Sequence, residues 1–169
     1  MKKFILKVAC FFAIVVAIDI IAGVAFPYLV ANAKGGDNGR NNYICLKTNE
    51  DILIFGSSRA IHHYHPTIIS DSTGMTCYNC GQDGNGVILN FGRLLMIEKR
   101  YSPKMIIYDI SNTFDLTAGE DNRKYLAWLK AYYDHDGVED VFVSVDSVER
   151  YKMMSNLYSY NSPCFQKRC

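Results

Sequence analysis

The fold is decided by the stretch Asp51-Ile52-Leu53-Ile54-Phe55-Gly56-Ser57-Ser58-Arg59, in which a short apolar run ends at a glycine and two serines follow. The apolar run is too short for a helix and is bounded by a glycine, so it predicts a buried strand. In an open α/β sheet, ligands bind just beyond the carboxyl ends of the strands. A serine at this place, on a tight turn into a helix, can present its hydroxyl to a substrate. The stretch therefore points to serine ester chemistry.

Two further strands are expected downstream, at Met75–Asn79 and at Met105–Ile110. One helix is expected from Pro66 to about Ser72, and a second is expected over Val87–Arg100, where apolar residues recur at helical spacing. Short strands that alternate with helices predict a parallel sheet in the order βαβαβ. The expected fold class is therefore α/β, a three-layer domain of the flavodoxin-like kind.

Polar segments follow all three expected strands. Right-handed crossovers place the carboxyl ends of these strands at one edge of the sheet. The segments are Ser57-Ser58, the glycine-rich loop Asn79–Gly86 and the stretch Asp109–Thr113. We expect them to converge on one crevice, where Arg59 could hold a carboxylate or an anionic group.

An apolar segment precedes the domain. Lysines stand at positions 2, 3 and 7, and Val8–Val30 is almost wholly apolar. At about 1.5 Å per residue, some 20 residues cross the hydrocarbon core of a bilayer, and a lone Asp19 costs roughly 2.5–3.5 kcal/mol there. The basic end is expected to stay in the cytoplasm, which predicts a single-pass membrane protein with its domain on the extracytoplasmic side. Ala31-Asn32-Ala33 has the form of a signal-peptidase site, so a cleaved signal peptide is the rival interpretation; both export the domain.

The chain is expected to divide into three parts. Residues 1–33 form the anchor, residues 34–50 form a polar, glycine-rich tether and lead-in, and residues 51–169 form the α/β domain. The last residues, 161–169, show no periodicity. We therefore expect the domain to be incomplete, through a truncation or a frameshift.

Patterns after residue 116 are weaker. Residues 124–133 and 148–158 predict helices, and residues 140–145 predict either a strand or the start of a helix. Trp128 and the tyrosines near it form either a face that stacks on carbohydrate or part of the core. The helical spacing favours the core.

Charge and cysteine content limit the function classes. The net charge of +1 gives no electrostatic reason to expect a nucleic-acid partner. Six cysteines fit an exported protein only loosely. Cys77 and Cys80 form a C-x-x-C without the second pair of a zinc ribbon, and Cys77 is expected in a strand rather than at a helix N-terminus. A structural or incidental pair is therefore favoured over a redox site, with Cys45 as a possible third partner.

The residues Phe55-Gly56-Ser57-Ser58 resemble the nucleophile block of the SGNH/GDSL hydrolase superfamily, in its exported, membrane-anchored branch of cell-envelope acyl esterases and acyltransferases. The resemblance covers about residues 51–116 and implies that Ser58 is the nucleophile. Asn79-Cys80-Gly81-Gln82-Asp83-Gly84 is similar to the second block, whose glycine N–H helps to form the oxyanion hole, a role that falls to Gly81 or Gly84.

The remaining two blocks of the superfamily match less well. The third supplies an asparagine as a second oxyanion donor, and Asn112 stands in that position after the third expected strand. The fourth is a C-terminal Asp-x-x-His, and these 169 residues contain none. A serine hydroxyl is a weak nucleophile without an adjacent base. His62 is the local candidate base if a helix begins at Ser58; His63, or a residue absent from this sequence, is the alternative.

Two functions from different classes follow. The first is an SGNH-type serine esterase or acyltransferase that acts on acyl groups of cell-envelope glycans or on small esters, with no metal or organic cofactor. The second is a catalytically inactive, membrane-anchored module that binds glycan or protein, including partners in envelope assembly.

Overall fold

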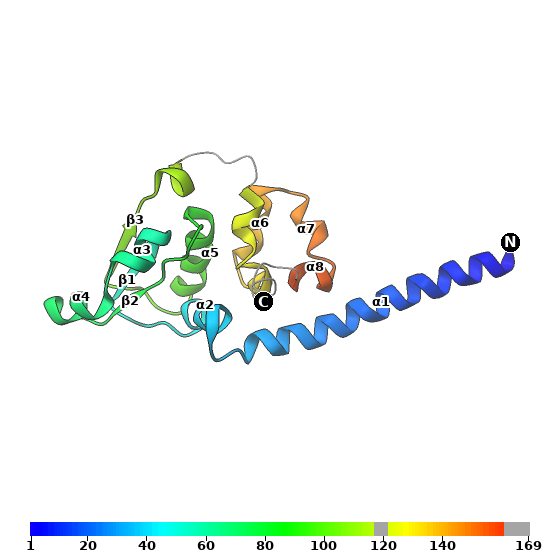
Figure 1. Cartoon of the computed structure of the whole chain (residues 1–169), viewed down its shortest axis with the longest axis horizontal. Coiled ribbons are helices and arrows are strands. Elements are labelled where there is room, and N and C mark those ends of the chain that lie inside the picture. Colours follow the sequence, from blue (N-terminus) through cyan, green and yellow to red (C-terminus); the bar gives the residue numbers. More distant parts are fainter. Residues whose placement is uncertain (117–121, 161–169) are drawn as a thin grey trace.

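The computed structural model describes residues 1–116 and 122–160 (Figure 1). In the described residues, three strands and helices α1–α5 come first, and a helical region with α6–α8 follows. The elements are α1 (Lys2–Ala31), α2 (Gly36–Leu46), β1 (Ile52–Gly56), α3 (Ser58–His63), α4 (Pro66–Thr73), β2 (Cys77–Asn79), α5 (Val87–Glu98), β3 (Met105–Asp109), the π-helical turn η1 (Asn112–Leu116), the 3-10 turns η2 (Asn122–Leu126) and η3 (Lys130–Tyr132), α6 (Val138–Val145), α7 (Glu149–Lys152) and α8 (Asn156–Tyr160).

The sheet is parallel, in the strand order β2-β1-β3. Ile52 pairs with Cys77 on one side and with Met105 on the other, and Gly56 at the end of β1 pairs with Asp109 at the end of β3. The prediction of a parallel α/β sheet from three short apolar runs is therefore confirmed. All three strands end at the same edge, which is where the predicted site residues lie.

Strand β1 forms the centre of the core because both of its faces are covered. Leu53 and Phe55 point to one side and pack with Ile44 of α2 and Ile97 of α5. Ile52 and Ile54 point to the opposite face and are also fully buried. A strand buried on both faces has no polar alternation, which is why its sequence is continuously apolar.

A second hydrophobic cluster lies on the other side of α5 (Figure 1). Leu89 and Met96 of α5 pack there with Leu126, Leu129 and Phe142. Helix α5 approaches this cluster closely through Gly92, where an added Cβ would lie 2.4 Å from Leu129 Cδ1. One helix thus joins the sheet to the helical region that follows it.

Helix α1 is long and apolar enough to cross a membrane, and its two parts have different surroundings. Residues 1–18 are all exposed and extend away from the rest of the molecule (Figure 1). From Asp19 onward the helix lies against the domain. The Asp19 carboxylate accepts hydrogen bonds from the Ser155 hydroxyl at 2.8 Å and from the Leu157 N–H at 3.0 Å, and it also accepts from the backbone and side chain of Asn156. The Phe26 ring lies 5.5 Å from that of Tyr160.

The segment that was expected to be a tether differs from that prediction. Helix α2 begins at Gly36, within the glycine- and asparagine-rich stretch, and its side chains Asn41 and Asn42 are buried. Asn42 donates to the Val30 carbonyl at 2.6 Å, and Asn41 donates to the Trp128 carbonyl at 2.9 Å. Composition predicted a loop here, but these distant partners satisfy the asparagines inside the protein.

The region after residue 121 is helical and more broken than expected. Residues 124–133 form 3-10 turns, and 140–145 belong to helix α6. The single helix expected over 148–158 is two short helices, α7 and α8. The expectations for 161–169 lie outside the described residues.

Candidate functional site

The two serines occupy different environments at the end of β1. Gly56 has φ +143°, and a Cβ there would lie 2.8 Å from the Asp109 carbonyl oxygen, so only glycine fits this turn. Ser57 precedes α3 and is buried, without a side-chain capping bond. Ser58 is the first residue of α3 and is partly exposed. Of the two hydroxyls, that of Ser58 is the one open to a substrate.

The loop after β2 lies directly against α3. The Asn79 side chain donates to the Ala60 carbonyl at 2.7 Å and to the Tyr64 carbonyl at 3.0 Å. The Gln82 N–H donates to the Gly56 carbonyl at 3.1 Å. A Cβ on Gly81 would lie 2.7 Å from the Ile61 nitrogen. These contacts bring the exit of β2 against the helix that carries Ser58.

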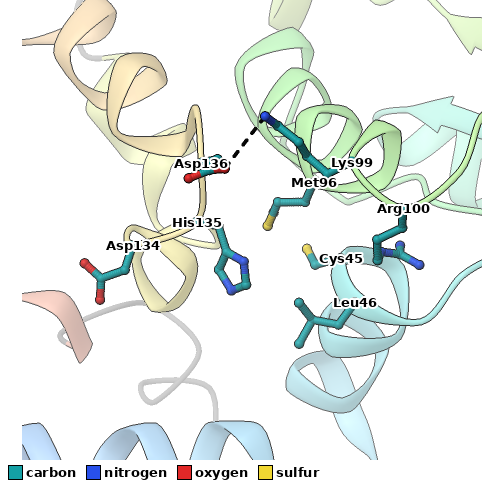
Figure 2. Close-up of a pocket in the computed structure, with 8 residues that line it drawn as sticks. All are labelled: Cys45, Leu46, Met96, Lys99, Arg100, Asp134, His135 and Asp136. Atoms are coloured by element: carbon teal, nitrogen blue, oxygen red, sulfur yellow. Dashed lines mark ion pairs between the residues drawn. The ribbon is translucent and has the colours of Figure 1, made fainter.

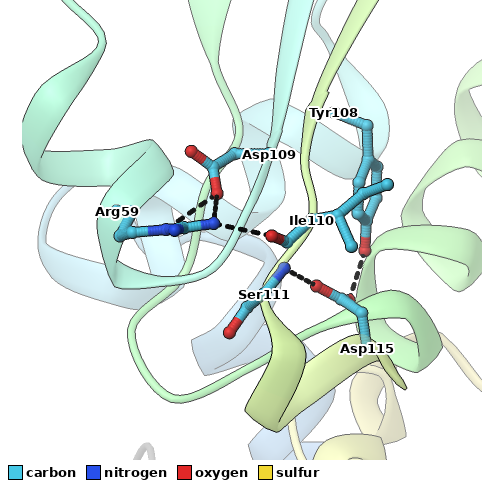
Figure 3. A network of polar contacts seen from close by, with 6 residues as sticks. All are labelled: Arg59, Tyr108, Asp109, Ile110, Ser111 and Asp115. Carbon is cyan, nitrogen blue, oxygen red and sulfur yellow. Dashed lines mark hydrogen bonds and ion pairs between the residues drawn. The ribbon is translucent and has the colours of Figure 1, made fainter.

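The exit of β3 joins the same edge through Arg59 (Figure 3). Arg59 binds Asp109 Oδ1 through Nε at 3.0 Å and through Nη2 at 2.6 Å, and Nη2 also donates to the Ile110 carbonyl at 2.6 Å. Tyr64 also hydrogen-bonds to Asp109, and this bond raises the pKa of the Tyr64 phenol. The Arg59 side chain is 57% exposed, so the structure shows the pair as a salt bridge at the surface, and a role for Arg59 in holding a ligand stays a prediction.

Asp115 fixes the turn that follows β3 (Figure 3). Its carboxylate accepts from the Tyr108 hydroxyl at 2.7 Å and from the Ser111 N–H at 2.6 Å. The β2 loop reaches this turn, since a Cβ on Gly86 would lie 2.3 Å from the Phe114 carbonyl oxygen. The three strand exits therefore meet at one edge of the sheet, as the sequence predicted.

His62 lies one helical turn after Ser58 and is paired with a carboxylate. Its Nε2 is 3.0 Å from Asp83 Oδ1, and the two side chains are 61% and 56% exposed. Residues four apart on a helix share one face, with Cβ atoms about 5–6 Å apart. Sequence reasoning named Ser58 and His62 and missed Asp83 as the partner, although an acidic residue between Gly81 and Gly84 was visible in the loop.

The predicted oxyanion donors lie in three positions around this edge. The Gly81 N–H donates to Asn79 Oδ1 at 2.9 Å, so another group of the protein already uses that donor. Gly84 is exposed at the tip of the loop with φ +66°. Asn112 is exposed at the first position of η1. Their roles in catalysis stay predictions.

A buried arginine supports the β2 loop from the interior. Arg93 of α5 is fully buried; its Nε and Nη2 donate to Asn41 Oδ1 at 3.0 and 2.7 Å, and its Nη1 donates to the Cys80 carbonyl at 2.8 Å. Its Nη2 also donates to Gln82 Oε1 at 3.2 Å. Burial lowers the pKa of the guanidinium, but an arginine remains charged at neutral pH. This role of Arg93 was not predictable from the sequence, because the pattern over α5 shows only the helical spacing of its apolar residues.

Four cysteines, at positions 10, 45, 77 and 80, are free thiols. Burial raises the pKa values of the Cys45 and Cys80 thiols to about 12, so neither is a thiolate at neutral pH. Cys45 lines a pocket of about 310 Å³ together with Met96 and His135 (Figure 2). A 3.8 Å ion pair between Lys99 and Asp136 lies at the same pocket. His135 belongs to this pocket, while His62 belongs to the strand exits.

Within residues 1–116 and 122–160, no three histidine, cysteine or acidic side chains gather as a metal site. No family model, curated protein or solved structure matches this chain. The proposed function therefore rests on the geometry of the strand exits.

Proposed function

We propose that this protein is an SGNH-type serine esterase or acyltransferase that acts on acyl groups of cell-envelope glycans. One observation carries the proposal: His62, paired with Asp83, lies one helical turn after Ser58. A serine, a histidine and a carboxylate in this relation have the residue types of a hydrolase triad. The parallel strand order β2-β1-β3 and the position of Ser58 at the exit of the central strand support the same superfamily.

The three side chains take separate roles. Ser58 Oγ attacks the carbonyl carbon of an acyl ester, and His62 accepts the hydroxyl proton as the new C–O bond forms. The tetrahedral intermediate collapses when the ester bond to the alcohol breaks, and His62 returns the proton to the departing alcohol. Asp83 holds the imidazole in orientation and stabilises its charged form. Water or a glycan hydroxyl then attacks acyl-Ser58, which gives hydrolysis or acyl transfer.

Gly81, Gly84 and Asn112 are the proposed donors to the oxyanion of this intermediate. Preorganised N–H donors are among the largest contributors to such catalysis. The Gly81 N–H becomes available when the Asn79 side chain turns away from it. Gly84 and Asn112 are both exposed at the strand exits.

Helix α1 serves in this proposal as the membrane anchor. Its length and apolar composition suit a single span, and its basic end would stay in the cytoplasm. The strand exits would then face the extracytoplasmic side, where acylated envelope polymers are found.

The proposal is tested with the full chain in detergent micelles, a fluorophosphonate probe and a short-chain aryl ester. We expect the probe to label Ser58 and not the buried Ser57, as read by mass spectrometry of the labelled peptide. Ser58→Ala abolishes labelling, and His62→Ala lowers ester turnover by at least 100-fold. His63→Ala, on the neighbouring exposed position of α3, is the matched control and retains turnover. Unchanged turnover in Ser58→Ala contradicts the nucleophile role.

A second function, an inactive module that binds glycan or protein, is favoured by one observation. The Gly81 N–H is already bonded to Asn79, which leaves the predicted oxyanion hole incomplete. An absence of labelling in a sample that melts cooperatively supports this second function.

A further inference from the structure

A pocket of about 250 Å³ adjoins the His62–Asp83 pair. Its lining comes from several elements: Ile61 of α3, residues 82–85 of the β2 loop, and Lys124 and Trp128 from the turns η2–η3. We call this the loop pocket. Asp83 both lines it and contacts His62, so a molecule in the loop pocket would lie beside the proposed base. The pocket is smaller than the ~300–1,000 Å³ of sites for drug-sized ligands, which suits a single small ring.

Gln82 provides the first polar group of the loop pocket. Its side-chain oxygen accepts from Arg93 Nη2 at 3.2 Å and from Arg40 Nη1 at 3.4 Å. Because a guanidinium only donates, the atom that faces the two arginines is the oxygen and not the nitrogen. Gln82 is 9% exposed, and its Nε2 donates to no group in the described part of the chain. This nitrogen is not among the fully buried atoms of the described chain, so it is open to an acceptor from a ligand or from water.

Asn85 provides the complementary group. Its Nδ2 donates to the Asp83 carbonyl at 2.8 Å, which identifies the opposite atom, Oδ1, as an acceptor. Asn85 is 7% exposed, and its Oδ1 accepts from no group among residues 1–116 and 122–160. The lining of the loop pocket therefore includes one side chain with an available donor and one with an available acceptor, on residues that are more than nine-tenths buried.

The other residues that line the loop pocket indicate which class of ligand it fits. Trp128 packs against the second hydrophobic cluster, as its helical spacing predicted, and its remaining surface lines the pocket. Asp83 adds a carboxylate that can accept from hydroxyl groups. The two carboxylates of the lining, Asp37 and Asp83, outnumber its one ammonium, Lys124, and this balance disfavours an anionic ligand. The buried amides disfavour a wholly apolar one, because each would lose its contact with water without a replacement. A sugar ring has an apolar face that can lie on an aromatic side chain and hydroxyl groups that both donate and accept.

We infer that the loop pocket binds one uncharged sugar ring of a glycan, held by Gln82, Asn85 and Asp83 and in contact with Trp128. This inference deepens the proposed function, on which it rests for the choice of glycan, because it places the sugar next to the His62–Asp83 pair. The inference also suggests a role for Arg93. Its hydrogen bond to the Gln82 side-chain oxygen leaves the amide nitrogen on the side away from the interior.

Trp128 makes the inference directly measurable, because the chain contains one tryptophan. We titrate the full chain in micelles with the N-acetylglucosamine trimer and follow the tryptophan emission, with the galacturonic acid trimer as the anionic comparison. We expect a saturable change with the neutral trimer and none with the anionic one. An unchanged emission up to ~10 mM neutral trimer, or tighter binding of the anionic trimer, overturns the inference.

Gln82→Glu is the decisive variant. It keeps an oxygen toward Arg93 and Arg40 but replaces the donor nitrogen with a second acceptor, and it adds a negative charge. We expect at least tenfold weaker binding of the neutral trimer, since one lost hydrogen bond corresponds to about tenfold. Asn49→Asp makes the same chemical change on an exposed side chain near the opposite end of β1 and should bind as the wild type does. Equal binding by Gln82→Glu and the wild type overturns the inference.

Ser58→Ala separates this inference from the proposed function. Ser58 does not line the loop pocket, so this variant should bind the neutral trimer as the wild type does. Binding by Ser58→Ala together with no probe labelling of the wild type supports the sugar site and contradicts the enzyme. Labelling of the wild type without any response to the trimer supports the enzyme and contradicts the sugar site.

Discussion

Glu50 joins helix α2 to the start of the central strand. Its carboxylate accepts hydrogen bonds from the Tyr43 and Thr48 hydroxyls and from the Asn49 N–H. Partial burial opposes ionisation, but the hydrogen bonds from Thr48 and Tyr43 outweigh it and hold the pKa of Glu50 below its ordinary value of 4.5. The bond to Glu50 and burial together raise the pKa of Tyr43 from 10 to about 12.

These two shifts predict the pH range over which Glu50 stabilises the fold. A lowered carboxyl pKa adds stability above the ordinary value, which is lost as the pH falls through the folded value. A raised phenol pKa adds stability below pH 10, which is lost as the pH rises toward 12. Glu50→Gln should therefore lower the free energy of unfolding by about 1 kcal/mol between pH 4.5 and 10, and by less outside that range. Urea unfolding at a series of pH values measures this. Asp71→Asn, on an exposed position of α4, should track the wild type, and a constant difference at every pH contradicts the assignment.

At the residue scale, the sequence predicted what adjacent residues determine. The apolar run that ends at Gly56 placed Ser58 correctly at a strand exit, and the same reasoning placed Arg59 and Asp109 within reach of each other. The pairing of His62 with Asp83 spans 21 positions and depends on the shape of the β2 loop, which no local pattern specifies. The side chains that meet inside the loop pocket were unpredictable for the same reason.

Helix α5 is the element on which both clusters depend, and Gly92 sets its approach to the second. An added side chain there meets Leu129, which is fully buried. Gly92→Val should lower the free energy of unfolding by about 1–3 kcal/mol, because extra methyl groups overfill the contact. In the double variant Gly92→Val/Leu129→Ala, the loss should be smaller than the sum of the two single losses. Urea unfolding of all four proteins gives these values. Strictly additive losses in the free energy of unfolding would show that a side chain added at position 92 does not contact Leu129.

Elements were predictable where apolar spacing was regular and unpredictable where buried polar groups hold a helix in place. The three strands and α5 were found from their patterns, with ends that differ by one or two residues from those observed. Helix α2 was missed because glycine and asparagine are typical of loops, while Asn41 and Asn42 have partners far along the chain. Helices α7 and α8 were predicted as one helix, because nothing in the sequence shows that Asp19 of another helix caps α8.

At the scale of the whole molecule, Asp19 connects the apolar helix to the far end of the described chain. Asp19→Ala removes the acceptor for Ser155, Asn156 and Leu157, so α8 loses the only N-terminal partners that the structure describes for it. We expect the free energy of unfolding to fall, as for the loss of a helix cap. Amide hydrogen exchange at Asn156 and Leu157 should speed up while that in β1 stays slow.

Asp71→Ala removes a carboxylate of the same kind from an exposed position and serves as the control for Asp19→Ala. Unchanged exchange at Asn156 and Leu157 in Asp19→Ala would show that α1 and α8 do not hold each other. Cleavage after Ala33 would remove Asp19 and Val30 together, and with them the contacts that these residues make with α8 and with Asn42.

The docked half of α1 also limits how far the domain can stand from a lipid surface. The exposed part, from Lys2 to Ile18, is about 26 Å long, slightly less than the ~30 Å of a hydrocarbon core, so a full span by α1 would bring the docked half of the helix up to the lipid. An anchor of this kind leaves no slack between bilayer and domain. If the protein is the membrane-anchored enzyme that we propose, the crevice stays at a nearly constant height and reaches only polymers that run close along the lipid headgroups.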